Sequence, residues 1–328
     1  MNQGCFTGGC STCPMAEREA LLSARFAALR WMPMQDDLCN ELSAFLDSHA
    51  LPRDLLPMLQ RYYLPLAERL KGLHQESAKK PVTLGINGAQ GSGKSTLAAV
   101  LALICRQRFG WRVAVLSMDD LYLGRVARQE LVARVHPLLA TRGVPGTHDV
   151  PLGLQTIQAM REAQAGDRVL LPRFDKGRDE PRPREQWEMV AGPVDLLIFE
   201  GWCLGAAPQA QSELAGPCNE LERLEDAGGI WRDYVNRQLA DVYPLLFDAI
   251  DFRVFLKVPD FESVLRWRIQ QEEGLPTPGM DSAQLARFVL FFERLTRHQL
   301  QTQPADSHVV FELDREHRVA VAVYRHDG

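Results

Sequence analysis

The architecture of this chain follows from one run of residues, Val82-Thr83-Leu84-Gly85-Ile86-Asn87-Gly88-Ala89-Gln90-Gly91-Ser92-Gly93-Lys94-Ser95-Thr96. Residues 82–87 are mostly apolar and predict a short buried strand. Residues 88–95 fit the pattern G-x-x-x-x-G-K-[ST], the P-loop motif. Residues 96–104 contain no Gly or Pro and favour a helix. Strand, glycine-rich loop and helix in this order are the context that the motif requires.

The composition of this loop predicts a site for a nucleoside triphosphate. Small residues let backbone N–H groups close around phosphate oxygens, and the start of the helix adds positive potential. Lys94 can reach the β- and γ-phosphates, and the Ser95 hydroxyl can hold Mg²⁺. The alternative is a glycine-rich turn that binds nothing. The residues predicted to bind the nucleotide are Gly88, Ala89, Gln90, Gly91, Ser92, Gly93, Lys94, Ser95 and Thr96.

Length and charge narrow the class of protein further. The chain has 328 residues, enough for one large α/β domain with an extension. Its net charge of -5 disfavours nucleic acid as a partner. It has no run of the ~20 apolar residues that a membrane helix needs, and no secretory signal pattern. We therefore expect a cytoplasmic protein with no membrane partner, and the sequence leaves its oligomeric state open.

Two regions precede the P-loop. Residues 1–15 form a predicted disordered tail with Cys5, Cys10 and Cys13, which is either a metal or redox site or an oxidation-prone tail. Residues 16–78 form a predicted helical extension, with helices at 16–31, 37–48 and 55–73. This extension is either a layer packed on the nucleotide-binding domain or a surface for a partner or a second copy.

Strands and helices alternate through residues 79–328, the predicted nucleotide-binding domain. We expect strands at 111–116, 168–171, 194–199 and 252–258, helices at 152–165, 230–247, 259–273 and 282–301, and a final hairpin of strands 308–313 and 319–324. Residues 124–150 lack periodicity and read as a functional loop. The alternation predicts an α/β fold with a doubly wound parallel sheet flanked by helices.

Acidic residues follow two of these strands. Asp119 and Asp120 end the strand at 111–116 and share a polar cluster with Tyr122, and Glu200 ends the strand at 194–199. Open parallel sheets bind ligands at this edge, so Asp120 and Tyr122 are also expected to bind substrate. Either aspartate could orient the attacking hydroxyl in phosphoryl transfer. Glu200 lies where a strand-end carboxylate holds Mg²⁺, together with Ser95.

A basic loop provides a candidate anion-binding site. Residues 172–184 contain Arg173 and Lys176 among several prolines and glycines. The loop is either a cradle for an anionic substrate or simply a solvated loop.

The motifs together resemble the D-glycerate 3-kinase branch of the phosphoribulokinase, uridine kinase and pantothenate kinase group. The resemblance covers about residues 82–323 in the same order. It rests on the P-loop and on Ser117-Met118-Asp119-Asp120-Leu121-Tyr122, Arg142-Gly143-Val144-Pro145-Gly146-Thr147-His148-Asp149, Pro172-Arg173-Phe174-Asp175-Lys176 and Phe199-Glu200-Gly201-Trp202.

The resemblance implies roles for single residues. Asp119 matches the group's catalytic base, Glu200 its metal-associated acid, and Arg266 and Arg268 the arginines of a lid at about 260–280. The residues that fall in segments shaping the acceptor site are Arg142, His148, Asp149, Arg173 and Lys176.

The implied activity is transfer of the γ-phosphate of ATP, with Mg²⁺, to a hydroxyl of a small acceptor, with D-glycerate favoured. An anionic hydroxy acid fits the arginine-rich surroundings, because Arg pairs a carboxylate through two parallel hydrogen bonds. A nucleoside, a sugar or another hydroxy acid remains open. A regulatory switch would need an N-K-x-D guanine motif, which the sequence lacks. The presence of Lys94, Ser95, Asp119 and Glu200 disfavours a nucleotide-binding protein without catalysis.

Overall fold

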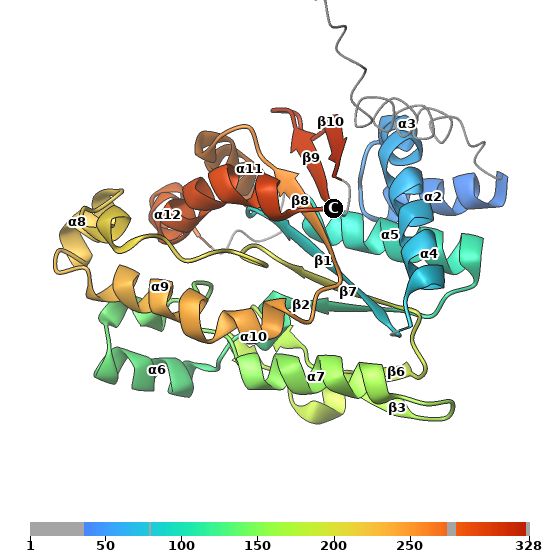
Figure 1. Cartoon of the computed structure of the whole chain (residues 1–328). Helices are drawn as coiled ribbons and strands as arrows, with labels where there is room; N and C mark the ends of the chain where they lie inside the picture. The colour runs from blue at the N-terminus through green and yellow to red at the C-terminus, as the bar shows by residue number, and fades with distance from the viewer. Residues whose placement is uncertain (1–35, 79, 274–279, 326–328) are drawn as a thin grey trace, which may run out of the picture.

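The computed structural model describes residues 36–78, 80–273 and 280–325. The central sheet consists of β1 (Val82–Gly88), β2 (Val113–Ser117), β7 (Leu196–Gly201), β8 (Phe252–Lys257), β9 (Val309–Leu313) and β10 (Val319–Tyr324). Their order is β10-β9-β8-β1-β7-β2 (Figure 1). All neighbours are parallel except the β9–β10 hairpin, which is antiparallel. The structure confirms the predicted parallel sheet and its terminal hairpin.

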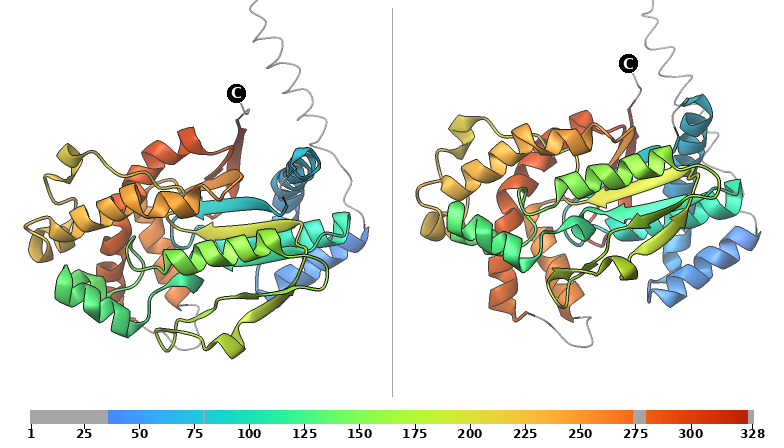
Figure 2. Two further views of the ribbon diagram at one scale, coloured as in Figure 1. Left: turned by 60° about the horizontal axis from the view of Figure 1, so that its bottom comes forward. Right: turned by 90° about the horizontal axis from the view of Figure 1, so that it is seen from below.

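Helices cover both faces of the sheet. The helices of the described residues are α2 (Asp36–Ser48), α3 (Leu56–Met58), α4 (Leu64–Glu76), α5 (Lys94–Phe109), α6 (Arg125–Arg134), α7 (Val150–Glu162), α8 (Glu220–Glu225), α9 (Ile230–Asp241), α10 (Tyr243–Phe247), α11 (Phe261–Glu273) and α12 (Ser282–Asp306). The α5 side and the α7, α9 and α10 side each have a hydrophobic core (Figures 1 and 2). The buried strand side chains alternate between these two cores, as a doubly wound sheet requires.

Short elements connect the longer ones. Antiparallel pairs form between β3 (Arg168–Leu171) and β6 (Glu188–Ala191), and between β4 (Phe174–Asp175) and β5 (Glu180–Pro181). Short 3₁₀ turns span Arg53–Leu55, Met118–Leu121, Pro137–Ala140, Arg184–Gln186 and Gln211–Leu214, and a π turn spans Leu59–Tyr63.

The described part of the N-terminal extension packs on the P-loop helix. Leu42 and Leu46 of α2, with Leu66 and Leu70 of α4, are fully buried in the core that contains Leu101 of α5. Of the two alternatives for this region, the structure supports a layer on the nucleotide-binding domain. The predicted tail at 1–15, with Cys5, Cys10 and Cys13, and the predicted helix at 16–31 lie outside the described residues.

Two expectations need correction. The predicted loop at 124–150 contains the helix α6, whose buried side chains are only Arg128 and Leu131, so its apolar periodicity is too weak to predict a helix. The predicted strand at 168–171 exists as β3, but it pairs with β6 and lies outside the central sheet. Its outer residue Arg168 is exposed, whereas a central parallel strand is buried on both faces.

The sheet register brings the functional strand ends together. Glu200 of β7 lies beside Ile86 of β1 on one side and Ser117 of β2 on the other. The P-loop follows β1 directly, and Asp119 follows β2. The phosphate loop and the two acidic positions therefore share one edge of the sheet, as predicted.

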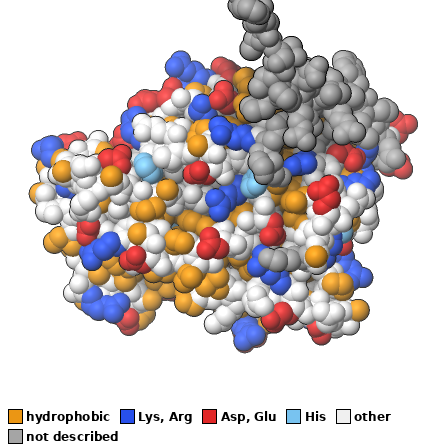
Figure 3. Space-filling view, viewed as in Figure 1, with side chains coloured by type: hydrophobic (Ala, Val, Ile, Leu, Met, Phe, Trp, Pro, Cys, Tyr) orange, Lys and Arg blue, Asp and Glu red, His pale blue; other side chains and the backbone are white. Residues whose placement is uncertain are grey.

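The surface agrees with the mixed charge of the sequence. Basic and acidic side chains are interspersed on the face shown in Figure 3. Among the described residues, no helix is both long enough and apolar enough to span a membrane. The predicted cytoplasmic location stays a prediction.

Candidate active site

The P-loop has the backbone geometry of a phosphate cradle. Gly91 and Gly93 have φ angles of +75° and +89°, which side chains with a Cβ rarely adopt. A Cβ on Gly88 would lie 2.9 Å from Leu256 Cβ, so the loop also needs glycine for close packing. Gly93 precedes the first residue of α5, so the loop closes over a helix N-terminus. The buried atoms Gln90 Oε1 and Ser92 Oγ have no hydrogen-bond partner.

Lys94, Ser95 and Glu200 lie together below this loop. Lys94 Nζ donates to Ala89 O at 3.0 Å, and burial lowers its pKa while the charges of Glu200 and Asp119 oppose that shift. Ser95 Oγ donates to Glu200 Oε1 at 3.0 Å. Glu200 is only 6% exposed. The structure thus brings the predicted phosphate ligand Lys94 to the predicted metal ligands.

Asp119 lies in the turn after β2 with both carboxylate oxygens bonded. Tyr122 Oη donates to Oδ1 at 2.7 Å, and Lys176 Nζ donates to Oδ2 at 2.6 Å. Burial raises the pKa of Asp119, but Lys176, Tyr122 and the charge of Lys94 outweigh this effect and keep the pKa below its usual value. The group is therefore an ionised carboxylate near Lys94.

Asp120 faces a different set of partners. Asp120 Oδ2 accepts from Arg173 Nη1 at 3.0 Å, and its Oδ1 accepts from the backbone N–H of Phe174 at 3.1 Å. Burial raises the pKa of Asp120, and Arg173 opposes this shift. Arg173 also donates to Val115 O at 3.3 Å, Pro172 O at 3.1 Å and the Glu188 carboxylate. These bonds tie the basic loop to β2, and the acceptor-binding roles predicted for Asp120 and Arg173 stay predictions.

Arg142 and Lys176 lie over the aromatic side of the site. The Arg142 guanidinium pairs with Asp179 and donates to Lys176 O at 3.3 Å. It lies 6.0 Å from the Tyr122 ring centroid and 5.5 Å from that of Phe174. The Lys176 side chain remains 62% exposed. Both cations therefore border the Asp119 and Tyr122 pair.

Asp149 has a local structural role. Its carboxylate accepts from Leu152 N at 2.9 Å and caps α7 at its N-terminus. This bond places the predicted substrate-binding residue at a helix end, where Asp is favoured for capping alone.

His148 lies beneath Tyr122 and is 5% exposed. The ring centroids of the two residues are 4.8 Å apart. His148 Nδ1 is 2.6 Å from Tyr243 Oη, whereas Nε2 is buried without a partner. Burial lowers the pKa of His148 to about 4, so the imidazole is neutral at pH 7.

The arginines of the predicted lid bond within their own helix. Arg266 is exposed and donates to Ser263 Oγ at 2.8 Å, and Arg268 donates to Glu272 at 3.2 Å. Between them, Trp267 packs on the P-loop, because a Cβ on Gly91 would lie 3.1 Å from Trp267 Cβ. Helix α11 therefore lies on the loop, and its two arginines contact neither Asp119 nor Glu200 through a described hydrogen bond. Residues 274–279 of the predicted lid lie outside the described residues.

Tyr243 is a site residue that sequence reasoning missed. It is fully buried, and its hydroxyl contacts both Gly146 N and His148 Nδ1. It lies in a predicted helical run about 95 residues after His148, and no local pattern in that run points to the site.

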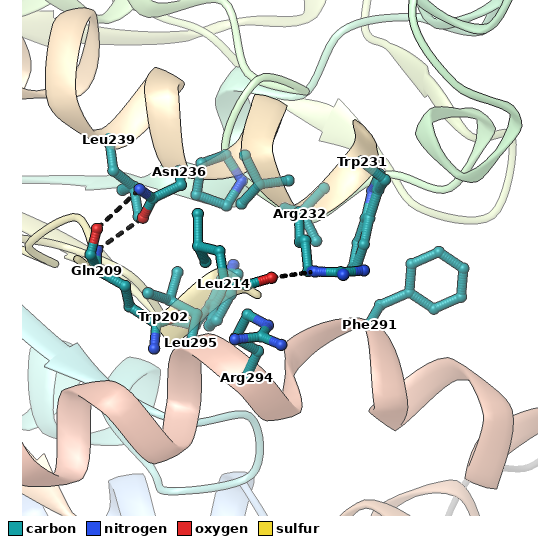
Figure 4. Close-up of a pocket in the computed structure, with 13 residues that line it drawn as sticks. Trp202, Gln209, Leu214, Trp231, Arg232, Asn236, Leu239, Phe291, Arg294 and Leu295 are labelled. Atoms are coloured by element: carbon teal, nitrogen blue, oxygen red, sulfur yellow. Dashed lines mark hydrogen bonds between the residues drawn. The ribbon is translucent and has the colours of Figure 1, made fainter. Parts of the chain in front are cut away.

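A separate pocket lies between α9 and α12 (Figure 4). Its empty volume is about 370 Å³, part of it open to solvent. Its walls include Trp202, Trp231 and Leu295, while Arg232 donates to Leu214 O at 2.8 Å. Lys94, Asp119 and Glu200 do not line this pocket. It is therefore distinct from the phosphate side of the site.

Comparisons with known proteins agree with this geometry, although no family model matches the sequence. The uncharacterized kinase mug58 of Schizosaccharomyces pombe is 34% identical over 221 residues, which cover 64% of this chain and 78% of the relative. The chloroplastic D-glycerate 3-kinase of Arabidopsis thaliana is 28% identical over 76% of this chain. The match spans about half of that enzyme, 55% of its length. A solved structure of D-glycerate 3-kinase from Cryptococcus neoformans is 26% identical, with a TM-score of 0.66, and the match covers 80% of this chain and 97% of that one.

A mostly parallel sheet with a P-loop after β1, Asp119 after β2 and Glu200 near the end of β7 defines a P-loop kinase that phosphorylates small molecules. Within that class, the chain belongs to the D-glycerate 3-kinase-like branch of the phosphoribulokinase, uridine kinase and pantothenate kinase group.

Proposed function

We propose that the protein transfers the γ-phosphate of ATP to a hydroxyl of D-glycerate, or of a closely similar small hydroxy acid. The observation that carries this proposal is the convergence of Lys94, Ser95, Glu200 and Asp119 at one edge of the sheet. D-glycerate is favoured because two of the matched relatives are D-glycerate 3-kinases.

The nucleotide side fits Mg-ATP. Ser92 Oγ is a buried hydroxyl without a partner, and its O–H can donate to a phosphate oxygen, while the positive φ angles of Gly91 and Gly93 shape the backbone of the loop. The donor set of the Ser95 hydroxyl and the Glu200 carboxylate suits Mg²⁺, which prefers oxygen ligands and needs few from the protein. When bound, Mg²⁺ neutralises charge on the β- and γ-phosphates. Lys94 would add its own charge to the same phosphates.

Asp119 would position the attacking hydroxyl. Its carboxylate is ionised, and its oxygens accept hydrogen bonds from Tyr122 and Lys176. The acceptor hydroxyl would replace Lys176 as one of these two donors. Phosphoryl transfer has a loose transition state, and orientation of the hydroxyl then matters more than base strength. Tyr122 keeps the carboxylate fixed while Lys176 exchanges. Asp119 would accept the hydroxyl proton as the bond from the acceptor oxygen to the γ-phosphorus forms and the bond from that phosphorus to ADP breaks.

The cations that border Asp119 would select an anionic acceptor. The Lys176 side chain is exposed, and its ammonium group would leave Asp119 by breaking the hydrogen bond between them. Arg142 lies over the rings of Tyr122 and Phe174. Arg173 is less suited to this task because four protein oxygens already bind its guanidinium. Arg266 and Arg268 would approach the phosphates only after α11 or their side chains rearrange.

A panel assay tests the proposal. ADP release by the purified protein would be measured with Mg-ATP and D-glycerate, L-glycerate, other hydroxy acids, sugars and nucleosides, each with a no-acceptor control. We expect the highest kcat/KM with D-glycerate. A nucleoside or sugar as the best acceptor would contradict the glycerate assignment, and tighter binding of Mg-GTP than Mg-ATP would favour a regulatory switch instead.

A further inference from the structure

A chain of three hydrogen-bonding groups lies behind the acceptor side of the site. The backbone N–H of Gly146 donates to Tyr243 Oη at 2.8 Å, and Tyr243 Oη is 2.6 Å from His148 Nδ1. Tyr243 is 0% exposed and His148 is 5% exposed, so water does not compete for either hydrogen bond. Burial raises the pKa of Tyr243 well above its usual value, and the phenol therefore keeps its proton.

The direction of the second bond follows from the position of that proton. Tyr243 Oη already accepts from Gly146, and among the described residues its O–H reaches no acceptor other than His148 Nδ1. If Nδ1 were the donor instead, the buried phenolic proton would have no acceptor, which is costly. Tyr243 therefore donates and Nδ1 accepts. In a neutral imidazole the ring proton then lies on Nε2.

That Nε2–H is a buried donor without a partner. It belongs to a ring that packs on Tyr122, and Tyr122 donates to Asp119 at 2.7 Å. The Asp119 charge acts on the imidazole and raises its pKa slightly against the effect of burial. The unpaired donor is therefore in the electrostatic range of the carboxylate where the acceptor hydroxyl must be placed. Unpaired buried donors are rare because they destabilise the fold, and a bound ligand would satisfy this one.

We propose that Tyr243 fixes the tautomer of His148 so that its Nε2–H donates a hydrogen bond to an oxygen of the acceptor molecule. This oxygen is a carboxylate or hydroxyl oxygen other than the one that receives the phosphoryl group. The inference rests on the proposed function, since it assumes an acceptor beside Asp119. His148 would contact the substrate, and Tyr243 would be a positioning residue that acts only through His148.

The short β4–β5 hairpin packs on Tyr122 and Asp119, the groups that lie next to His148 on the acceptor side. Phe174 packs edge-on against Tyr122 with ring centroids 5.4 Å apart, and Lys176 bonds to Asp119. Nε2 is closed to solvent in this arrangement. The acceptor would displace Lys176 from Asp119 and reach the imidazole from the same side, so the hydrogen bond forms only when the acceptor is bound.

Nitrogen NMR of the full chain with ¹⁵N-labelled histidine tests the tautomer without any turnover. The His148 signals are assigned by their loss in His148→Gln. We expect a neutral ring with the proton on Nε2 in the wild type and a mixture of tautomers in Tyr243→Phe. The Tyr62→Phe variant is the control, because it removes another partly buried hydroxyl bond, to Ala320 O, and should leave the His148 signals unchanged. A proton on Nδ1 in the wild type would overturn the proposal.

Kinetics then test the contact with the acceptor. A Gln side chain carries its N–H₂ near the position of Nε2, whereas Asn carries it near Nδ1. We expect His148→Asn to raise the acceptor KM by roughly 10- to 100-fold, as for a lost hydrogen bond to a charged group, with His148→Gln clearly milder and the ATP KM unchanged for both. Equal acceptor KM values for the two variants would overturn the contact. If wild-type protein fails to phosphorylate glycerate while the NMR result holds, the proposed acceptor is wrong and the tautomer assignment stands.

Discussion

The phosphate side and the acceptor side of the proposed site are built in different ways. The phosphate side comes from one continuous run, from β1 through the P-loop into α5, and backbone geometry at Gly91 and Gly93 shapes it. The acceptor side is assembled from the turn after β2, the loop before α7 and the β4–β5 hairpin, joined by pairs such as Asp119–Lys176 and Asp120–Arg173. A cradle made of backbone groups binds the same class of ligand whatever its side chains are. Paired side chains on loops can be substituted, and this suits a fold that supports many acceptors.

Lys94→Ala should break the phosphate side completely. The β- and γ-phosphates would lose their P-loop cation, so we expect no measurable turnover and much weaker binding of Mg-ATP. Calorimetric titration with Mg-ATP and the ADP-release assay provide the two measurements. Lys71→Ala, on α4 against Phe109, is a control that should retain activity. Substantial turnover by Lys94→Ala would show that the loop does not act on the transferred phosphate.

Asp119→Asn should damage the acceptor side and leave the phosphate side intact. We expect kcat to fall by about 10²- to 10⁴-fold with little change in ATP affinity. Asp120→Asn is the matched control and should lower kcat much less, because Asp120 bonds to Arg173 and Phe174 N. An inactive Asp120→Asn beside a near-normal Asp119→Asn would reverse the two assignments.

His148 should make stability depend on pH. Its pKa is about 4 in the folded state and near 6.5 when unfolded, so the unfolded chain binds more protons between these values. Through this group, the free energy of unfolding is at its full value above pH 6.5 and falls by about 3 kcal/mol as the pH drops to 4. Urea unfolding of the wild type and His148→Gln at pH 7, 6 and 5 would measure it. Parallel loss of stability in both proteins would assign the effect to other groups.

Among these variants, Arg173→Lys should have the smallest effect on activity. Lysine keeps the charge but cannot bind several oxygens in the plane of a guanidinium. Because Arg173 ties the basic loop to β2, we expect about 1–2 kcal/mol lower stability and nearly unchanged KM values. Thermal unfolding and acceptor kinetics separate the two roles. A large rise in acceptor KM alone would establish Arg173 as the carboxylate-binding residue that the sequence suggested.

Local signals explain how much of this molecule could be predicted from its sequence. The strands at 82–87 and 194–199, the P-loop and the terminal hairpin carry their information in consecutive residues, and the structure confirms them. The helix α6 was missed because it carries no apolar stripe: its buried residues are Arg128 and Leu131, and Arg128 pairs with Asp179 of another segment.

The acceptor side was harder to predict because its contacts are distant in sequence. Sequence reasoning could place Asp120 and Arg173 near the site, but not show that they bond to each other across 53 residues. Tyr243 carried no signal at all, since a buried tyrosine in a helical run is ordinary core composition. The residues that needed tertiary structure are those whose partners come from another segment.

The bond between Lys176 and Asp119 also bears on the hydrolysis of ATP by the enzyme when no acceptor is bound. A P-loop kinase that holds Mg-ATP with no acceptor present can waste it on water, if a carboxylate is free to orient a water molecule. Here Tyr122 and Lys176 each take one carboxylate oxygen of Asp119. Displacement of the Lys176 ammonium group by water is unfavourable, because the charged group loses its counter-ion. An anionic acceptor can displace it more easily, because the acceptor becomes its new counter-ion. The same contact would therefore couple nucleotide consumption to the arrival of the acceptor.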